Sequence, residues 1–245
     1  MRILLTVAYD GTNYFGWQRQ KGDPVPTVEQ KLYEACNFLF RKDFELIGAS
    51  RTDRGVHALG QRVVLDVDTN IPVERLPRAL NSFLPEDIVA SGAELVSDTF
   101  HPRYDCVKKT YRYRILNSEY KNPMERKYTE FVHRPLDVEK MKEASVYFKG
   151  THDFKGFCSS QTEVKSTVRT IFDIAVEKNG NIVEIYVTGD GFLYNMVRII
   201  AGTLIYVGLS KIKPEDMGDI IASMDRARAG KTAGPEGLTL MKIYY

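Results

Sequence analysis

The sequence predicts an α+β protein made of two similar lobes. Some short segments alternate apolar and polar residues, which is typical of strands, whereas others repeat apolar residues at helical spacing. Each half of the 245-residue chain contains both kinds of segment, and the halves meet around residues 103–110. We therefore expect an N-terminal lobe at residues 1–105 and a C-terminal lobe at residues 106–245.

In the first half, the pattern predicts four strands and two helices. Thr27 and Gln30 have the spacing of a capping box, which begins a helix that runs to about Phe40 with apolar side chains along one face. A second helix is predicted over residues 74–83. Apolar runs bounded by turn residues predict strands at residues 3–9, 44–50, 62–68 and 88–95.

The second half is predicted to contain a hairpin, three more strands and three helices. Asp137 caps a helix that continues through Phe148, and Asn179-Gly180 is a typical hairpin turn. The other helices are predicted at residues 192–207 and 214–224. Strands are predicted at residues 109–116, 128–133, 170–178, 181–188 and 238–244.

The segment at residues 192–207 is apolar almost all round, which is typical of a buried helix. A membrane span is the alternative, but the segment is at the lower length limit and contains Arg198 and Gly202. A buried guanidinium without a partner would cost roughly several kcal/mol, so Arg198 needs an acidic partner. We expect Asp53 in that position, with Asp190 as the alternative.

The most informative segment is Gly48–Ala58, which places Asp53 between Arg51 and Arg54 in a loop of small residues. Nearby positive charge favours the ionised form of the carboxylate, and small residues leave room for another molecule to approach it. Strand-like runs flank the segment, so we expect a loop held by a sheet, as is common in active sites. The alternative is an ordinary surface ion pair.

The densest basic segment, residues 108–114, also carries aromatic rings. Its alternation places Tyr111 and Tyr113 on one face of a strand, and Arg112 and Arg114 on the other. Rings stack on unpaired bases while cations contact phosphates, so the segment is suited to RNA. A strand with core tyrosines and a solvated basic edge explains the same pattern equally well.

A second segment that combines rings and cations is residues 14–21, which contains Trp17, the only tryptophan of the chain. It follows a predicted strand and precedes Pro24 and Pro26, so we expect a loop. Trp17 is there either a core side chain or a platform on which a base stacks.

Composition narrows the possible functions. A hydrophobic content of 43% and a charged content of 27% are typical of a soluble globular protein, and a net charge of +2 is too small to indicate nucleic acid by itself. Three widely spaced cysteines and four scattered histidines lack the spacing of a disulfide framework or a metal site. The N-terminal apolar run is too short for a signal peptide, so we expect a cytoplasmic protein without a membrane segment.

Six motifs, in order along nearly the whole chain, resemble the TruA family of tRNA pseudouridine synthases. The most specific is Ser50-Arg51-Thr52-Asp53-Arg54-Gly55-Val56-His57-Ala58. The others are Tyr9-Asp10-Gly11-Thr12, Phe15-Gly16-Trp17-Gln18-Arg19-Gln20, Tyr111-Arg112-Tyr113, His152-Asp153-Phe154 and Phe192-Leu193-Tyr194-Asn195-Met196-Val197-Arg198.

The resemblance implies a pseudouridine synthase fold, in which two ferredoxin-like lobes share a mainly antiparallel sheet around a central active-site cleft. It also implies an activity and partners. A homodimer would bind the anticodon arm of tRNA and isomerise uridine to pseudouridine at positions 38, 39 and 40. Neither a cofactor nor a metal is implied.

Roles for individual residues follow from the same resemblance. Asp53 would be the nucleophile, Arg198 the group that keeps it ionised, and Arg51 an aid to extruding the nucleotide. Tyr111 would stack on the target base. The further substrate-binding residues that we expect are Arg54, Trp17, Arg19, Lys108 and Lys109.

Two other classes of function remain open from the residues. A catalytically silent tRNA-binding protein would keep the basic and aromatic surfaces but would not need Asp53 held between cations. A carboxylate-dependent hydrolase of glycosides or nucleosides would need a second carboxylate as general acid. Asp10 and Asp190 are the candidates for that acid, and neither has a setting like that of Asp53.

Overall fold

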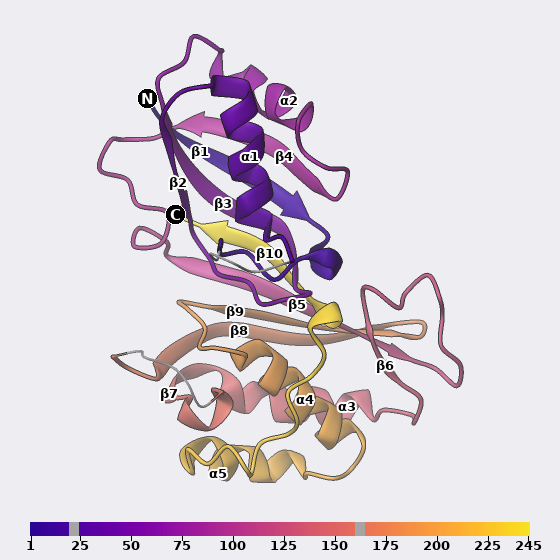
Figure 1. Ribbon diagram of the computed structural model, residues 1–245. Coiled ribbons are helices and arrows are strands. Elements are labelled where there is room, and N and C mark those ends of the chain that lie inside the picture. Colours follow the sequence, from indigo (N-terminus) through magenta and orange to yellow (C-terminus); the bar gives the residue numbers. More distant parts are fainter. Residues whose placement is uncertain (20–24, 160–164) are drawn as a thin grey trace. The chain divides into compact units, whose positions relative to one another are not determined.

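The computed structural model describes residues 1–19, 25–159 and 165–245, which form two compact units (Figure 1). Unit 1 comprises Met1–Val107 together with Thr239–Tyr245, and unit 2 comprises Lys108–Leu238. From Thr239 on, the last strand thus falls in unit 1, whereas the sequence pattern places it in the C-terminal lobe. The reason is that this strand pairs with a strand of unit 1, and a strand's sequence does not reveal its distant partner.

Unit 1 is built on a mainly antiparallel sheet. The strand β1 (Arg2–Tyr9) lies between β3 (His57–Val67) and β4 (Ile88–Leu95) and is antiparallel to both. The later part of β3 pairs with β2 (Phe44–Gly48), while its first residues pair in parallel with β10 (Leu238–Tyr244). This change of partner occurs where the chain enters β3, directly after the Asp53 loop.

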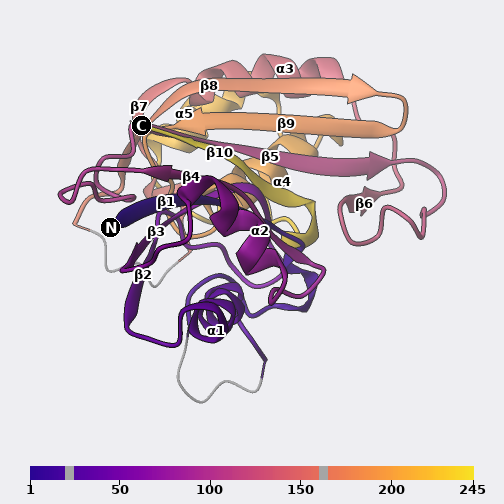
Figure 2. The same cartoon turned by 90° about the horizontal axis from the view of Figure 1, so that it is seen from above.

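Two helices cover one face of this sheet, as α1 shows most clearly (Figures 1 and 2). The helix α1 (Val28–Phe40) begins where expected, because the Thr27 hydroxyl accepts the Gln30 N–H at 3.2 Å. The second helix is shorter than predicted. A 3₁₀ turn at Val73–Arg75 precedes α2 (Leu76–Asn81).

Four strands of unit 2 pair antiparallel in the order β5 (Lys108–Asn117), β9 (Ile182–Gly189), β8 (Val168–Asn179) and β7 (Gly150–Asp153). The hairpin of β8 and β9 is confirmed. The short β7 was not predicted, because four residues give too little alternation. The predicted strand at residues 128–133 is reduced to β6 (Glu130–Val132), which pairs in parallel with the end of β5.

The helices of unit 2 include α3 (Val138–Ser145), which is capped as predicted by Asp137, whose side chain accepts the Lys140 N–H at 3.1 Å. A 3₁₀ turn, Val146–Phe148, continues this helix. The predicted helix at residues 214–224 consists of a 3₁₀ turn, Pro214–Asp216, followed by α5 (Met217–Ala222).

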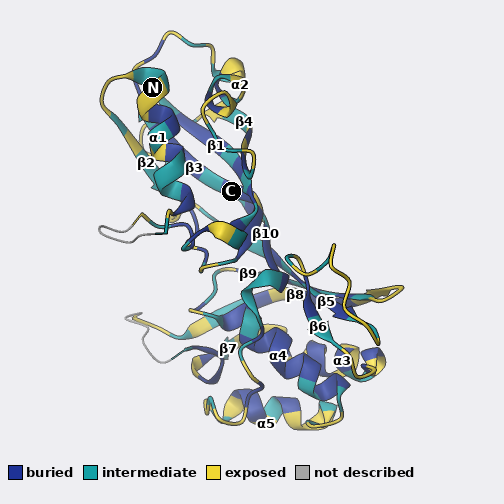
Figure 3. Cartoon of the chain, turned by 45° about the vertical axis from the view of Figure 1, so that its right-hand side comes forward, coloured by how far each residue is buried: buried dark blue, intermediate teal, exposed yellow. Residues whose placement is uncertain are grey.

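The apolar helix α4 (Met196–Gly208) is buried, as its composition predicts (Figure 3). Every residue except Arg198 and Tyr206 is buried. The helix starts four residues later than predicted, because Asn195 adopts a left-handed conformation with φ of 61°. Within the described parts of the chain, no helix has both the length and the apolar character needed to cross a bilayer.

Candidate active site

The loop at residues 49–56, which we call the Asp53 loop, is held mainly by backbone groups. The Trp17 N–H donates to the Thr52 carbonyl at 3.0 Å, and the Gly55 N–H donates to the Tyr14 carbonyl at 3.4 Å. Gly16 has φ of +82°, and a Cβ there would lie 2.5 Å from the Thr52 carbonyl oxygen. The close approach therefore requires glycine in this place.

Polar side chains lie beneath the same loop. The Tyr9 hydroxyl and the Thr52 Oγ1 are 2.7 Å apart and buried. His57, which is also buried, accepts the Gly11 N–H on Nδ1 at 3.1 Å. A Cβ on Gly11 would lie 2.0 Å from the Val56 carbonyl oxygen, so this side of the loop is also in direct backbone contact. Both the backbone of the loop and the polar side chains beneath it are therefore held in place.

Asp53 itself lies in a turn, in which its carbonyl accepts the Val56 N–H at 3.1 Å. Its side chain is half-buried, whereas Arg51 and Arg54 are exposed. The Arg54 guanidinium lies 5.4 Å from the centre of the Phe15 ring, within the range of a cation–π contact. The loop thus places one carboxylate and two exposed guanidinium groups within four residues of sequence.

The structure decides the alternatives for Trp17 in favour of the core. The indole is 1% exposed, and its ring centre lies 5.9 Å from that of Tyr9. On its other side, a Cβ at Gly48 would come within 2.3 Å of the indole nitrogen. In this structure the enclosed ring offers no face to a base, and the substrate contact of Trp17 stays a prediction.

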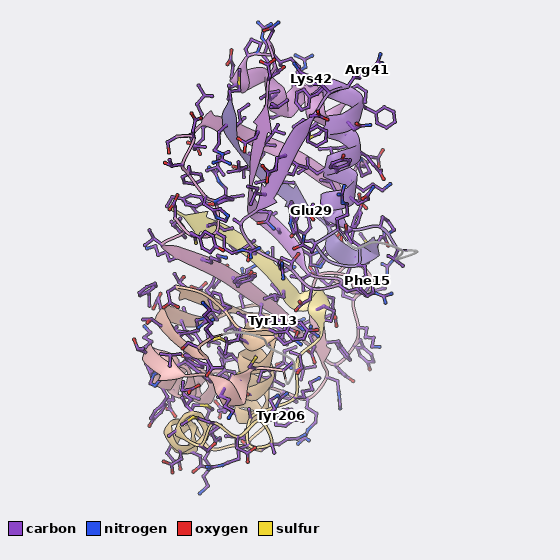
Figure 4. The ribbon with its side chains drawn as sticks, turned by 60° about the vertical axis from the view of Figure 1, so that its left-hand side comes forward. Phe15, Glu29, Arg41, Lys42, Tyr113 and Tyr206 are labelled. Atoms are coloured by element: carbon purple, nitrogen blue, oxygen red, sulfur yellow. The ribbon has the colours of Figure 1, made fainter. Side chains whose placement is uncertain are left out.

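Arg19 remains exposed, on the segment that leads into α1. Its guanidinium lies 4.4 Å from the centre of the Tyr33 ring. The carboxylate of Glu29, a residue of α1 that Figure 4 labels, accepts the Arg19 backbone N–H at 2.7 Å, which ties this segment to the first turn of the helix. Gln20 of the same motif lies outside the described residues.

The strand β5 has the predicted two faces. Tyr111 and Tyr113 are buried, and Arg112 and Arg114 lie on the opposite face. Both guanidinium groups pair with Glu184 of β9, at 3.5 and 3.2 Å respectively. This carboxylate offsets part of the positive charge that the sequence places on the strand.

The other substrate contacts expected on β5 lie at and near its first residues. Lys108 and Lys109 are half-buried there. Tyr111 is 6% exposed, and its ring meets that of Phe192 at 85° with 5.2 Å between the centres. A base can therefore stack on Tyr111 only if the groups that cover its ring, Phe192 among them, move aside.

Arg198 lies in the first turn of α4 and is half-buried. Its Nε donates to the Ala233 carbonyl at 2.7 Å, and one terminal nitrogen donates to the Asn195 side chain at 2.6 Å. Asp190, the alternative acidic partner, accepts the Thr170 N–H at 3.0 Å. Two neutral oxygens thus orient the guanidinium within unit 2.

Glu130 was not predicted as a functional residue; it is 6% exposed and interacts with residues far away in the chain. Its carboxylate accepts the Gly234 N–H at 2.9 Å and forms an ion pair with Lys231. The available signal was a charged residue directly before two apolar residues in a predicted strand. The segment at residues 230–234, which we call the strap, also contains the Ala233 carbonyl that holds Arg198.

The described residues offer no evident metal site. Among them, no three side chains of His, Cys, Asp or Glu come together in a way that could hold a metal ion. None of the three cysteines, all of which lie in the described residues, forms a disulfide. Burial raises the pKa of Cys36 to about 12, so this thiol is a poor nucleophile at neutral pH. The Asp53 carboxylate is the better candidate for nucleophilic chemistry.

Comparison with known proteins gives a consistent result. A family model described as tRNA pseudouridine synthase matches residues 5–105 and 144–245. The tRNA pseudouridine synthase A of Thermoanaerobacter sp. (strain X514) is 49% identical over 243 residues, which cover 99% of each chain. The tRNA pseudouridine synthase A 2 of Clostridium tetani is 49% identical over 99% of this chain and 98% of its own length. The tRNA pseudouridine synthase A of Acetivibrio thermocellus is 47% identical over 99% of each chain.

The matched ranges include most of the segments described above. The Asp53 loop lies in the first range, and Arg198 and the strap lie in the second. Tyr111 and Glu130 fall between the two ranges, but the full-length relatives span them as well. Identity close to one half over the whole chain, together with the family match, establishes that the protein belongs to the tRNA pseudouridine synthase family.

Proposed function

We propose that the protein converts uridine to pseudouridine at positions 38, 39 and 40 of the tRNA anticodon arm, with Asp53 as the nucleophile. The observation that carries this proposal is the Asp53 loop. It presents a half-buried carboxylate between two exposed guanidinium groups on a backbone fixed by Gly16 and Gly11. Such a loop combines a rigid nucleophile with cations for the flanking phosphates.

The reaction is an isomerisation, so atoms balance within the nucleotide. The bond between N1 of uracil and C1′ of the ribose breaks, and a bond between C5 and C1′ forms. C5 loses its proton, and N1 of the product carries one. We place the chemistry of Asp53 on the sugar side, where its carboxylate captures or stabilises C1′ while the uracil turns.

The remaining roles concern access to the base. Flipping a nucleotide out of its stack costs about a few kcal/mol, which phosphate contacts and an aromatic neighbour offset. We assign the phosphate contacts to Arg51, Arg54 and Arg19, and to the two lysines at the start of β5, Lys108 and Lys109. Tyr111 is the proposed stacking ring. Arg198 is proposed to keep Asp53 ionised during the reaction.

The proposal also covers the oligomeric state and the location of the protein in the cell. The protein acts as a homodimer in the cytoplasm, without a cofactor or a metal. The family resemblance supports the dimer, and the tRNA substrate supports the location. Light scattering coupled to size exclusion tests the dimer directly, because a mass of 27.9 kDa would identify a monomer.

The test of substrate and positions uses unmodified tRNA transcripts that carry uridine at positions 38, 39 and 40, or cytidine at one or more of them. After incubation without added metal or cofactor, the RNA is digested, and uridine and pseudouridine are separated by retention, because their masses are equal. We expect pseudouridine only where uridine remains at these positions.

Three outcomes would contradict the proposal. Pseudouridine elsewhere in the transcript would overturn the assignment of positions. Free uracil in place of pseudouridine would identify a hydrolase, and bound but unaltered tRNA would identify a silent tRNA-binding protein. A suitable control for a substitution of Asp53 by Asn is Asp68→Asn, since Asp68 is an exposed carboxylate of unit 1 that pairs with Lys42.

A further inference from the structure

The strap, residues 230–234, runs directly over α4. The Gly230 N–H donates to Thr203 Oγ1 at 2.9 Å, and this hydroxyl donates in turn to the Ile199 carbonyl at 2.7 Å. A Cβ on Gly202 would lie 1.9 Å from the Lys231 carbonyl oxygen. The strap therefore touches the backbone of α4, and only glycine at position 202 permits this distance.

The far end of the strap holds Arg198 at two points. The Arg198 Nε donates to the Ala233 carbonyl at 2.7 Å, and the Ala233 N–H donates to the Arg198 carbonyl at 3.1 Å. A single residue of the strap thus fixes both the backbone and the guanidinium of Arg198. If Ala233 shifts, the guanidinium must shift or lose its hydrogen bond.

Glu130 in turn holds the strap at both of its ends. One carboxylate oxygen accepts the Gly234 N–H at 2.9 Å, and the other pairs with the Lys231 ammonium. The hydroxyl of Tyr113, a residue that Figure 4 labels, lies 2.7 Å from this carboxylate and 2.8 Å from the Gly234 carbonyl oxygen, with one proton to share between them. Glu130, Tyr113 and the strap form one connected network.

The charge of Glu130 is part of this network. Burial raises the pKa of its carboxyl group, but the hydrogen bonds from Lys231, Tyr113 and Gly234 together lower that pKa below its ordinary value. The carboxylate is therefore ionised at neutral pH. For Tyr113, burial and the neighbouring Glu130 raise the pKa well above its ordinary value, so the hydroxyl keeps its proton as a donor.

We propose that Glu130 is a positioning residue for Arg198, which it orients through the strap. This inference rests on the proposed part of Arg198 in pseudouridine formation. The ionised carboxylate holds Gly234 and Lys231 on either side of Ala233, and the Ala233 carbonyl aims the guanidinium. Glu130 contacts neither substrate nor Asp53 in this scheme, and it acts only through the strap.

A positioning role has a kinetic consequence that a purely structural role does not have. Displacing a reacting or stabilising group by about 1 Å can cost about a hundredfold in rate, even when the mutated residue is far from the chemistry. Glu130→Gln should therefore lower kcat by roughly ten- to a hundredfold and leave KM for tRNA nearly unchanged.

The deciding experiment is a double-mutant cycle in kcat with wild type, Glu130→Gln, Arg198→Lys and the double variant. Lysine keeps the positive charge but has no Nε–H for the Ala233 carbonyl. If Glu130 acts through Arg198, Glu130→Gln lowers kcat in the wild-type background and has no further effect in the Arg198→Lys background. Lys231→Gln, which removes only the ion pair, should show a smaller effect with the same dependence on Arg198.

The control is Asp137→Ala, which removes the cap of α3. The Asp137 N–H bonds the Gly208 carbonyl at the opposite end of α4, ten residues and about 15 Å of helix away from Arg198. This variant should lose stability and keep its kcat.

Three results would overturn the inference. Glu130→Gln with wild-type kcat would show that the strap does not need the carboxylate. An equal loss in both backgrounds would show that Glu130 acts independently of Arg198. Wild-type kcat in Arg198→Lys would remove the positioning target. If the wild-type protein forms no pseudouridine at all, the proposed function itself fails, and this result is distinct from the other three.

Discussion

The Asp53 loop and the strap are both short segments without regular secondary structure, yet different interactions hold them. The loop is fixed by backbone hydrogen bonds and by glycines that allow close approach, such as Gly16 beside Thr52. The strap is fixed by a buried carboxylate, Glu130, with donors from three other residues. Steric contacts do not depend on pH, whereas a carboxylate holds its partners only while it is ionised.

This difference predicts opposite weaknesses. A single added methyl group should disturb the loop, because its contacts leave no space. The strap should be weakened by a loss of charge on Glu130, because the groups that donate to this carboxylate would then face a weaker acceptor in a buried site. The following predictions test this contrast, in order of decreasing effect.

The largest effect on stability is expected from Gly16→Ala. Alanine at a positive φ costs about 1–2 kcal/mol, and overpacking against the Thr52 carbonyl costs about 1–3 kcal/mol more. The free energy of unfolding should therefore fall by roughly 2–5 kcal/mol, measured from the urea midpoint at constant m-value.

Gly180→Ala provides the matched control. Gly180 also has a positive φ, of +57°, but apart from its own atoms and those of its two chain neighbours, no described atom lies within 4 Å of the position that its Cβ would take. Only the conformational cost of about 1–2 kcal/mol should remain. Equal shifts for the two variants would show that the contact with Thr52 does not constrain the loop.

A smaller, pH-dependent effect is expected from Glu130→Gln. At about pH 7, the free energy of unfolding of the variant should be about 1–3 kcal/mol lower than that of wild type. The reason is that the donors around position 130 then face a neutral amide instead of a buried charged acceptor. The pKa of Glu130 in the folded state is below its ordinary value of 4.5. The contribution of the Glu130 charge to stability is therefore fully present above pH 4.5 and is lost as the pH falls through the folded-state pKa.

Urea titrations of wild type and Glu130→Gln over a series of pH values measure this dependence. The difference in unfolding free energy between the two proteins should narrow below pH 4.5. The effect of Gly16→Ala should stay constant over the same range. A pH-independent difference for Glu130→Gln would show that shape, and not charge, holds the strap.

The smallest effect concerns Trp17, the only tryptophan of the chain. Its 1% exposure predicts blue-shifted fluorescence and weak quenching by acrylamide in the folded protein. Binding of tRNA should leave this emission nearly unchanged. The unfolded chain gives the reference emission of an exposed indole. Strong static quenching of the Trp17 fluorescence on tRNA binding would indicate that a base does reach the indole.

The sequence was sufficient where the signal is local. The caps at Thr27 and Asp137, the alternation along β5 and the position of the Asp53 loop between two strands all depend on neighbours within a few residues. These predictions are confirmed because capping and alternation are short-range properties.

Other features depend on contacts between distant residues and could not be predicted. Glu130 meets Lys231 and Gly234 across 101 and 104 positions of sequence. The burial of Trp17 depends on Gly48, and the late start of α4 depends on the left-handed conformation of Asn195. Hydrophobic periodicity carries no information about any of these.

The most direct test of the central claim, that the Asp53 carboxylate carries the chemistry, is a single-turnover experiment with tRNA bound to excess enzyme. Asp53→Asn keeps the size of the side chain and removes its charge. We predict that this variant binds tRNA with an affinity close to that of wild type and forms no pseudouridine on the time scale of many wild-type turnovers. Formation of pseudouridine by the bound variant at a rate near that of wild type would contradict the account.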